Sequence, residues 1–316
     1  MRVLTFGRTS PLIVRCEQVS KRYGEKLAVD GLDLEVDKGQ CFGLLGPNGA
    51  GKTTALRMIY GVTPPSAGRV LVFDQDITTH TREIRARLGV TLQENALVEV
   101  LSPVENLRVF GRYHLIPKAL LEERIEQLLD FLDLRSHAHV KVKALSGGFQ
   151  RRLAIALSLM NGPELLILDE PTTGLDPAVR LALWNRVREL RRAGTTVLLT
   201  THYMDEAERL CDALLVMDQG KVVARGSPRE LIHEVLAPEA LELELPAGRH
   251  GELLARLPGA RALRAGAHLM LYAKDGAALL EAVRRVDPEI SLVAVRPTNL
   301  EDVFLALTGT KLEGGA

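Results

Sequence analysis

The sequence predicts an α/β fold with a mixed sheet, followed by a small α+β domain. Two patterns indicate this. Between residues 163 and 226, short apolar runs alternate with helical segments, as expected of a βαβ sheet. After Pro238 the pattern changes to strictly alternating segments, LELELP and HLMLYAK, which are typical of half-buried strands and are accompanied by helical segments.

The first chemical feature is a glycine-rich loop between an apolar run and a helix. CFGLL, residues 41–45, predicts a buried strand, and the segment after the loop predicts a helix ending near Gly61. GPNGAGKTT matches G-x-x-x-x-G-K-[ST] at every fixed position, in the strand–loop–helix order of a phosphate-binding loop. A glycine turn without a ligand is the alternative, which the full match disfavours. The predicted nucleotide-binding residues are Gly46, Pro47, Asn48, Gly49, Ala50, Gly51, Lys52, Thr53 and Thr54.

These residue types suit ATP and Mg²⁺ and indicate a P-loop NTPase core. Lys52 supplies a charge for the β- and γ-phosphates, and Thr53 supplies a hydroxyl ligand for Mg²⁺. LLILDEP, residues 165–171, predicts a buried strand with two carboxylates at its carboxyl end. We expect Asp169 to hold Mg²⁺ and Glu170 to polarise water as a general base. A solvated acidic turn is the alternative for this pair.

Composition limits the function. Apolar residues make up 46% of the 316-residue chain, and 40 basic side chains balance 40 acidic ones, so no nucleic-acid-binding face is indicated. Cys16, Cys41 and Cys211 show no spacing typical of a metal site or a disulfide framework, which favours a reducing compartment. The sequence shows neither a signal peptide nor the roughly 18 consecutive apolar residues of a membrane helix, so we expect a soluble chain.

A second anion site is indicated almost a hundred residues after the first. LSGGFQRR, residues 145–152, places a serine and two glycines at a predicted helix start. Four further short motifs accompany the two glycine sites in a fixed order across residues 12–226: Tyr23 in VSKRYGEK, Gln93 in VTLQENA, Asp176 in TGLDP and His202 in LLTTHYMDEA. With these motifs in this order, the chain resembles the ATP-binding subunit of ABC transporters.

The resemblance implies a homodimer that encloses two ATP molecules. In the family, the signature loop of one copy binds the γ-phosphate held by the other, which here assigns that role to Ser146, Gly147 and Gly148. ATP would then join the dimer and hydrolysis would release it. The other implied site residues are Gln93 and His202 at the γ-phosphate, Gln93 also at Mg²⁺, Tyr23 at the adenine, and Asp176 at the nucleotide.

Taken alone, several of these residues have simpler explanations. Tyr23 is then a surface aromatic, Gln93 a loop residue and His202 an ordinary histidine at a strand end. His137 and His139 have no third metal ligand nearby, which favours a solvated loop. The sequence also departs from the family at Phe149, where the signature motif usually has glutamine.

The motifs divide the chain into an ATPase domain at residues 12–236 and a small α+β domain at residues 239–310. Residues 94–162 are predicted to be mostly helical and correspond to the family's helical subdomain, in which residues 97–116 would present a groove to a membrane permease. The last helix, EDVFLALTG, resembles the end of the C-terminal extension of drug-resistance and nodulation-factor exporters.

The resemblance therefore implies an ATP hydrolase on the cytoplasmic face of the cell membrane that powers a separately encoded permease. The cargo would be exported and would be a small molecule, a drug or a glycolipid. An importer subunit is one alternative, although the sugar-importing members have a β-rich barrel as their tail. A non-transport ABC ATPase would carry a long coiled coil or a second cassette, and a GTPase would need an N-K-x-D motif; this sequence has none of these.

Overall fold

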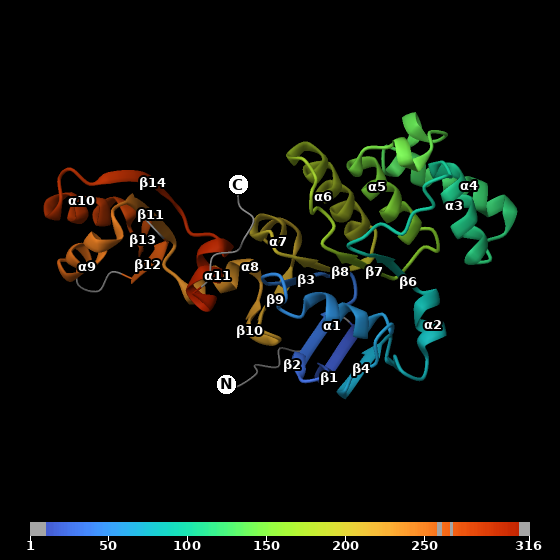
Figure 1. Cartoon of the computed structure of the whole chain (residues 1–316), viewed down its shortest axis with the longest axis horizontal. Coiled ribbons are helices and arrows are strands. Elements are labelled where there is room, and N and C mark those ends of the chain that lie inside the picture. Colours follow the sequence, from blue (N-terminus) through green and yellow to red (C-terminus); the bar gives the residue numbers. More distant parts are fainter. Residues whose placement is uncertain (1–10, 258–260, 266–267, 310–316) are drawn as a thin grey trace. The chain divides into compact units, whose positions relative to one another are not determined.

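The computed structural model describes residues 11–257, 261–265 and 268–309. The chain divides into two compact units, with the boundary between Val222 and Val223. The first unit combines a parallel sheet with helices, and the second combines an antiparallel sheet with helices (Figure 1). The predicted fold class is thereby confirmed.

An antiparallel sheet with the order β2-β1-β4-β5 forms one layer of the first unit. Val14 and Leu34 on its long strands are fully buried and pack in one core with Leu56 of the helix that follows the glycine loop. The strands of this sheet are β1 (Leu12–Tyr23), β2 (Lys26–Asp37), β4 (Ala67–Val72) and β5 (Gln75–Asp76).

The second sheet has the order β10-β9-β3-β8-β7-β6 and is parallel from β6 to β9. Every residue of β3, β7 and β8 is buried, as expected of strands covered on both faces. Its strands are β3 (Cys41–Leu45), β6 (Leu88–Thr91), β7 (Leu165–Asp169), β8 (Thr196–Thr201), β9 (Ala213–Asp218) and β10 (Lys221–Gly226).

Parallel strands bring their carboxyl ends to one edge of a sheet. Gly46, Glu170 and His202 each directly follow the last residue of β3, β7 or β8, and Gln93 follows β6 by two residues. The order of the sheet therefore collects residues that are up to 156 positions apart in the sequence.

Helices fill the connections of the first unit. Helix α4 buries one apolar face formed by Leu121, Ile125, Leu128 and Leu129, and Leu132, which follows the helix, is buried as well. The helices are α1 (Lys52–Ile59), α2 (Thr81–Ala86), α3 (Pro103–Tyr113), α4 (Lys118–Phe131), α5 (Gly147–Ser158), α6 (Pro177–Arg192) and α7 (Met204–Leu210), with the short 3₁₀ turns η1 (Arg135–His137) and η2 (Val142–Ala144).

The second unit contains a βαββαβ arrangement, whose sheet order β12-β13-β11-β14 is that of a ferredoxin-like fold. Leucines of β11 and β13 form one core with α9 and α10. Its elements are α8 (Pro228–Val235), β11 (Glu239–Glu244), α9 (Ala247–Ala255), β12 (Arg261–Ala265), β13 (His268–Ala273), α10 (Gly276–Val286), β14 (Ser291–Pro297) and α11 (Leu300–Thr308).

The last helix is fixed by a buried carboxylate. Asn299 caps α11 in a capping box with Asp302, as the sequence TNLED favours. Asp302 also accepts hydrogen bonds from the Tyr272 hydroxyl at 2.9 Å and from two nitrogens of Arg296 at 2.7 and 2.9 Å. No helix within the described residues is both long enough and apolar enough to span a membrane.

Candidate active site

One open cavity of about 400 Å³ gathers a subset of the residues that were predicted to bind nucleotide. They come from β1, the glycine loop, the segment after β6 and the end of β7. The cavity is lined by Tyr23, Lys26, Ala28, Asn48, Gly49, Ala50, Gly51, Lys52, Thr53, Thr54, Gln93 and Glu170. Tyr23 is 46% exposed, so its ring is available for stacking.

The glycine loop has a shape that only glycine allows at two positions. At Gly51, φ is 102° and an added Cβ would lie 2.5 Å from the backbone oxygen of Ala28. At Gly46, an added Cβ would lie 2.2 Å from the backbone oxygen of Met217. Helix α1 begins at Lys52, so its free backbone N–H groups lie at the loop, where a helix N-terminus binds phosphate.

Lys52 is a buried cation at the base of this loop. Its Nζ donates to the backbone oxygens of Gly46 at 2.7 Å and Pro47 at 3.0 Å, and lies 3.6 Å from Oε1 of Glu170. Burial lowers the pKa of Lys52, while the neighbouring carboxylates of Glu170 and Asp169 raise it. The amine is therefore held among oxygens, which suits it to contact a phosphate.

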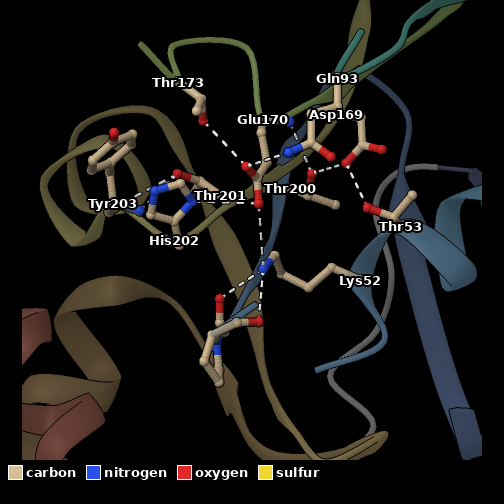
Figure 2. Close-up of polar contacts among 12 residues, drawn as sticks. Lys52, Thr53, Gln93, Asp169, Glu170, Thr173, Thr200, Thr201, His202 and Tyr203 are labelled. Atoms are coloured by element: carbon tan, nitrogen blue, oxygen red, sulfur yellow. Dashed lines mark hydrogen bonds and ion pairs between the residues drawn. The ribbon is translucent and has the colours of Figure 1, made fainter. Parts of the chain in front are cut away.

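Glu170 lies at the centre of the polar contacts in Figure 2. Its Oε1 is 3.3 Å from Nδ1 of His202, and its Oε2 accepts from Gln93 Nε2 at 3.3 Å and from Thr173 Oγ1 at 3.2 Å. His202 lowers the pKa of Glu170 most, burial opposes this, and the charge of Lys52 lowers it further. The carboxylate is thus ionised at neutral pH, as a general base must be.

Asp169 and Thr53 form the second oxygen-rich corner of the site. Thr53 Oγ1 donates to Asp169 Oδ1 at 3.2 Å, and Thr200 Oγ1 donates to the same oxygen at 2.5 Å (Figure 2). A hydroxyl and a carboxylate are ligands that Mg²⁺ accepts, so this donor set fits the ion. Gln93 uses its amide nitrogen for Glu170, and its amide oxygen is of the same ligand type.

The signature loop does not line this cavity. Ser146 is the N-cap of α5, and both it and Gly147 are exposed. A Cβ at Gly148 would lie 3.3 Å from Val179 of α6, the helix that Asp176 caps through Val179 N–H at 2.9 Å. The structure therefore brings the signature loop to the start of α6, outside the lining of the cavity that the glycine loop forms.

The departure at Phe149 places an aromatic ring directly after the two signature glycines. The Phe149 ring lies against His137, with ring centroids 4.0 Å apart. Gln150, the next residue, donates its side-chain amide to the backbone oxygens of Val142 and Leu145, each at 3.2 Å. Gln150 thus holds the turn that leads into the signature loop.

Arg151 is a residue of the site that sequence reasoning did not single out. Its guanidinium is buried and donates to the backbone oxygens of Asp169 at 2.8 Å, Glu170 at 3.0 Å, Pro171 at 2.8 Å and Leu92 at 2.5 Å. Burial lowers its pKa to about 10, so it stays charged. The only sequence signal is a second arginine beside the signature motif, which does not distinguish it from Arg152.

Comparison with known proteins gives the family. A family model described as ABC transporter matches residues 29–173, and one described as the C-terminal domain of the nodulation factor export protein NodI matches residues 249–309. A protein of Ralstonia nicotianae named Nod factor export ATP-binding protein I is 46% identical over 97% of both chains. This chain belongs to the ABC transporter ATPases. A Sinorhizobium fredii protein of the same name is 44% identical over 96% of this chain and 88% of its own length.

Solved structures support the same assignment for this ABC ATPase. A dimeric ATP-binding cassette bound to ADP and Pi in a post-hydrolysis state has a TM-score of 0.63 and 25% identity, over 68% of this chain and 98% of its own. An ADP-bound cassette of an ABC transporter has a TM-score of 0.63 and 32% identity, over 72% and 95%. The predicted ATP hydrolase and the exporter group are confirmed, and the importer and non-transport alternatives are not retained.

Proposed function

We propose that this ABC ATPase hydrolyses ATP with Glu170 as the general base. The position of Glu170 carries the proposal: its carboxylate lies within 3.6 Å of Lys52, His202 and Gln93 in the cavity that the glycine loop lines. Lys52 would bind the β- and γ-phosphates, while His202 and Gln93 would contact the γ-phosphate. Glu170 would accept a proton from the attacking water.

Thr53, Asp169 and Gln93 would supply the ligands for Mg²⁺. When bound, the ion neutralises charge that develops on the phosphate oxygens. Tyr23 would stack on the adenine, because its ring is exposed at the cavity. Asp176 would contact the nucleotide from the start of α6, next to the signature loop.

We further propose that two copies enclose two ATP molecules. Ser146, Gly147 and Gly148 are exposed or half-exposed at the N-terminus of α5, and they do not line the cavity of their own chain. A helix N-terminus with free N–H groups suits a γ-phosphate presented by the second copy. The dimeric cassette among the solved structures supports this arrangement.

The membrane partner would dock on the helical segment at residues 97–116. Val100, Tyr113 and Leu115 are 67%, 80% and 85% exposed, so this segment offers apolar surface to a partner. A neighbouring cleft of about 230 Å³ includes Phe110 and His114. The names of the relatives suggest the cargo class, a nodulation-factor-like glycolipid. The chain would lie peripherally on the cytoplasmic face of the membrane.

The ATPase domain would span residues 12–236 and the small α+β domain residues 239–310. All the nucleotide-site residues named above precede the boundary between the two compact units.

Reconstitution tests the proposed function. The chain and its membrane permease are assembled in inside-out vesicles, and uptake of a labelled glycolipid is measured with ATP and Mg²⁺. We expect uptake that requires ATP and stops with Glu170→Gln. Replacing Tyr113 and Leu115 by serine should abolish uptake while ATP hydrolysis by the free chain remains. Uptake that persists with Glu170→Gln contradicts the role of Glu170 as the general base. A complex with the permease that takes up no glycolipid contradicts the proposed cargo.

A further inference from the structure

A carboxyl group lies entirely inside the first unit, outside the cavity described above. Glu206 of α7 is 0% exposed, and its Oε1 accepts a hydrogen bond from Trp184 Nε1 of α6 at 3.0 Å. Its Oε2 and the Thr172 hydroxyl are both buried, and neither has a hydrogen-bond partner among the described residues. Burying polar atoms without hydrogen-bond partners destabilises a fold. The two unpaired atoms therefore call for an explanation, either a functional role or a proton shared between them.

Three segments of the active site meet at this carboxyl. The hydroxyls of Thr201 and Thr172 and the indole of Trp184 all act on Glu206. Thr201 directly precedes His202, and Thr172 follows Glu170 by two residues. Trp184 belongs to α6, which packs on α7 and begins directly after Asp176. Glu206 is therefore the side chain at which the segments of Glu170, His202 and Asp176 converge.

We propose that Glu206 is a positioning residue that fixes the segments of Glu170 and His202 relative to helix α6. The inference rests on the roles proposed above for Glu170 and His202. It assigns a function to a residue that does not itself contact the nucleotide cavity. Through α6, any movement at the start of that helix would change the distance between the base and the histidine.

The protonated form of Glu206 suits this task. Its carbonyl oxygen accepts from Trp184, and its hydroxyl hydrogen can be donated to Thr172, which pairs both buried atoms. Burial raises the pKa of Glu206, the neighbouring hydroxyls of Thr201 and Thr172 and the indole of Trp184 oppose this, and Asp205 raises it further. Burial therefore favours the neutral acid, the form that pairs both buried atoms.

The charged groups around Glu206 make its ionised form unfavourable. Asp205 on α7 repels it, and the buried thiol of Cys211 has its own pKa raised in part by Glu206. Arg151 on α5 is the cation that faces it, but all of its nitrogens already donate to oxygens near Glu170 and Gln93. We expect ionisation of Glu206 to loosen the site, so that hydrolysis falls as the pH rises through the titration of this carboxyl.

Three variants and a matched control test the proposal in the full-length chain. Glu206→Gln keeps both hydrogen bonds but cannot ionise, Glu206→Leu keeps the volume without the hydrogen bonds, and Trp184→Phe removes the indole N–H. Glu208 is exposed on the same helix, so Glu208→Gln and Glu208→Leu are the controls. Steady-state kcat and KM for ATP are measured from acidic to alkaline pH, together with the thermal unfolding midpoint.

The expected result separates positioning from stability. Glu206→Leu should lower kcat on the order of 10²-fold with KM for ATP unchanged, the effect of a displacement of about 1 Å in an active site. Glu206→Gln should keep a kcat far above that of Glu206→Leu and should lose the fall with rising pH. Trp184→Phe should lower kcat. The double variant Trp184→Phe/Glu206→Leu should have the same kcat as Glu206→Leu, since both changes remove the same hydrogen bond.

Each other outcome contradicts the inference. Wild-type kcat in Glu206→Leu overturns it, as does an equal fall in Glu206→Gln and Glu206→Leu at every pH. If Glu206→Leu fails to fold, a wild-type kcat in Trp184→Phe decides against it. If Glu170→Gln and His202→Ala both retain hydrolysis, the proposed catalytic roles fail instead. If Glu170→Gln and His202→Ala lose hydrolysis while Trp184→Phe and Glu206→Leu keep it, only the inference about Glu206 is refuted.

Discussion

The guanidinium of Arg151 donates a 3.0 Å hydrogen bond to the backbone oxygen of Glu170. Glu170 has a φ of 46°, a backbone conformation that residues other than glycine rarely adopt and that costs about 1–3 kcal/mol. Such a backbone persists only where its surroundings hold it. Arg151 supplies part of that support and, by also donating to Leu92, connects it to the Gln93 loop.

Arg151→Lys should lower kcat on the order of 10²-fold while ATP binding is kept. A lysine ammonium is a compact charge and cannot span the carbonyl groups of two separate segments as a planar guanidinium does. The measurement is kcat together with the Kd for ATP. Arg152→Lys is the control, since Arg152 lies 3.9 Å from Asp133 and has no part in this network. A wild-type kcat in Arg151→Lys would show that Glu170 is held by other groups.

Glu170→Gln should reduce ATP hydrolysis by roughly 10²–10⁴-fold, the usual effect of losing a general base. The amide keeps the size of the side chain, so ATP binding should remain. Two-chain species should accumulate with ATP and Mg²⁺, because the nucleotide that joins the copies is no longer consumed. Light scattering during size-exclusion chromatography reports the mass. A variant that hydrolyses ATP at the wild-type rate is incompatible with the assigned role.

Tyr23→Ala should weaken ATP binding by about 1–3 kcal/mol, the usual range for stacking of a base on an aromatic ring. Tyr23→Trp should not weaken it. Isothermal titration with ATP and with inorganic triphosphate separates the adenine from the phosphates. Equal weakening for both ligands would exclude an adenine contact.

A cross-link between Ser146 and Asn48 tests the two-chain site. Asn48 is preferred to its neighbour Gly49, whose φ of 82° disfavours any side chain. One chain carries Ser146→Cys, the other Asn48→Cys, and both carry Glu170→Gln. With a short dimaleimide, ATP and Mg²⁺, we expect a band of two chains' mass that fades without nucleotide.

The native cysteines serve as the internal control for this cross-link. They are buried, and burial raises the pKa of Cys16 to about 12, so a chain without added cysteines should give no band. A chain that carries both new cysteines and links only to itself at every concentration would show that the signature loop acts within one chain.

Asp302→Asn should destabilise the second unit by about 3–5 kcal/mol, the effect of breaking a buried ion pair. It removes the charge that Arg296 meets with two nitrogens, and it weakens the hydrogen bond from Tyr272. ATP hydrolysis by the first unit should remain. Differential scanning calorimetry should show one shifted transition. Glu301→Gln, an exposed neighbour, is the control, and a parallel loss of ATPase activity would contradict independent units.

Local patterns predicted those elements whose signal lies in neighbouring residues. The strand before Gly46 and the alternating strands β11 and β13 follow from short-range chemistry. Helix α9 and strand β12 were not predicted, because AGRHGELLA contains two glycines and RALRA offers only weak alternation. The ferredoxin-like order depends on which strands pair, and no local pattern records that.

The site divides in the same way. Lys52 and Glu170 lie in motifs from which their chemistry can be predicted, and the structure brings the two side chains together. Arg151 and Glu206 act through backbone oxygens and a buried indole on other segments. Their partners become neighbours only when the sheet order is known, so no spacing in the sequence distinguishes them from solvent-exposed charges.

The geometry of the glycine loop also predicts which amino-acid replacements the protein tolerates there. At Gly46 and Gly51 even the methyl group of alanine would collide with a main-chain oxygen, and no rotamer moves a backbone atom away. Every amino-acid replacement at these two codons should therefore be eliminated by selection. At Gly49 the added atom meets open space, and asparagine tolerates the left-handed backbone better than other residues. Divergence within this loop should thus be confined to single positions between invariant ones, whatever cargo the transporter comes to carry.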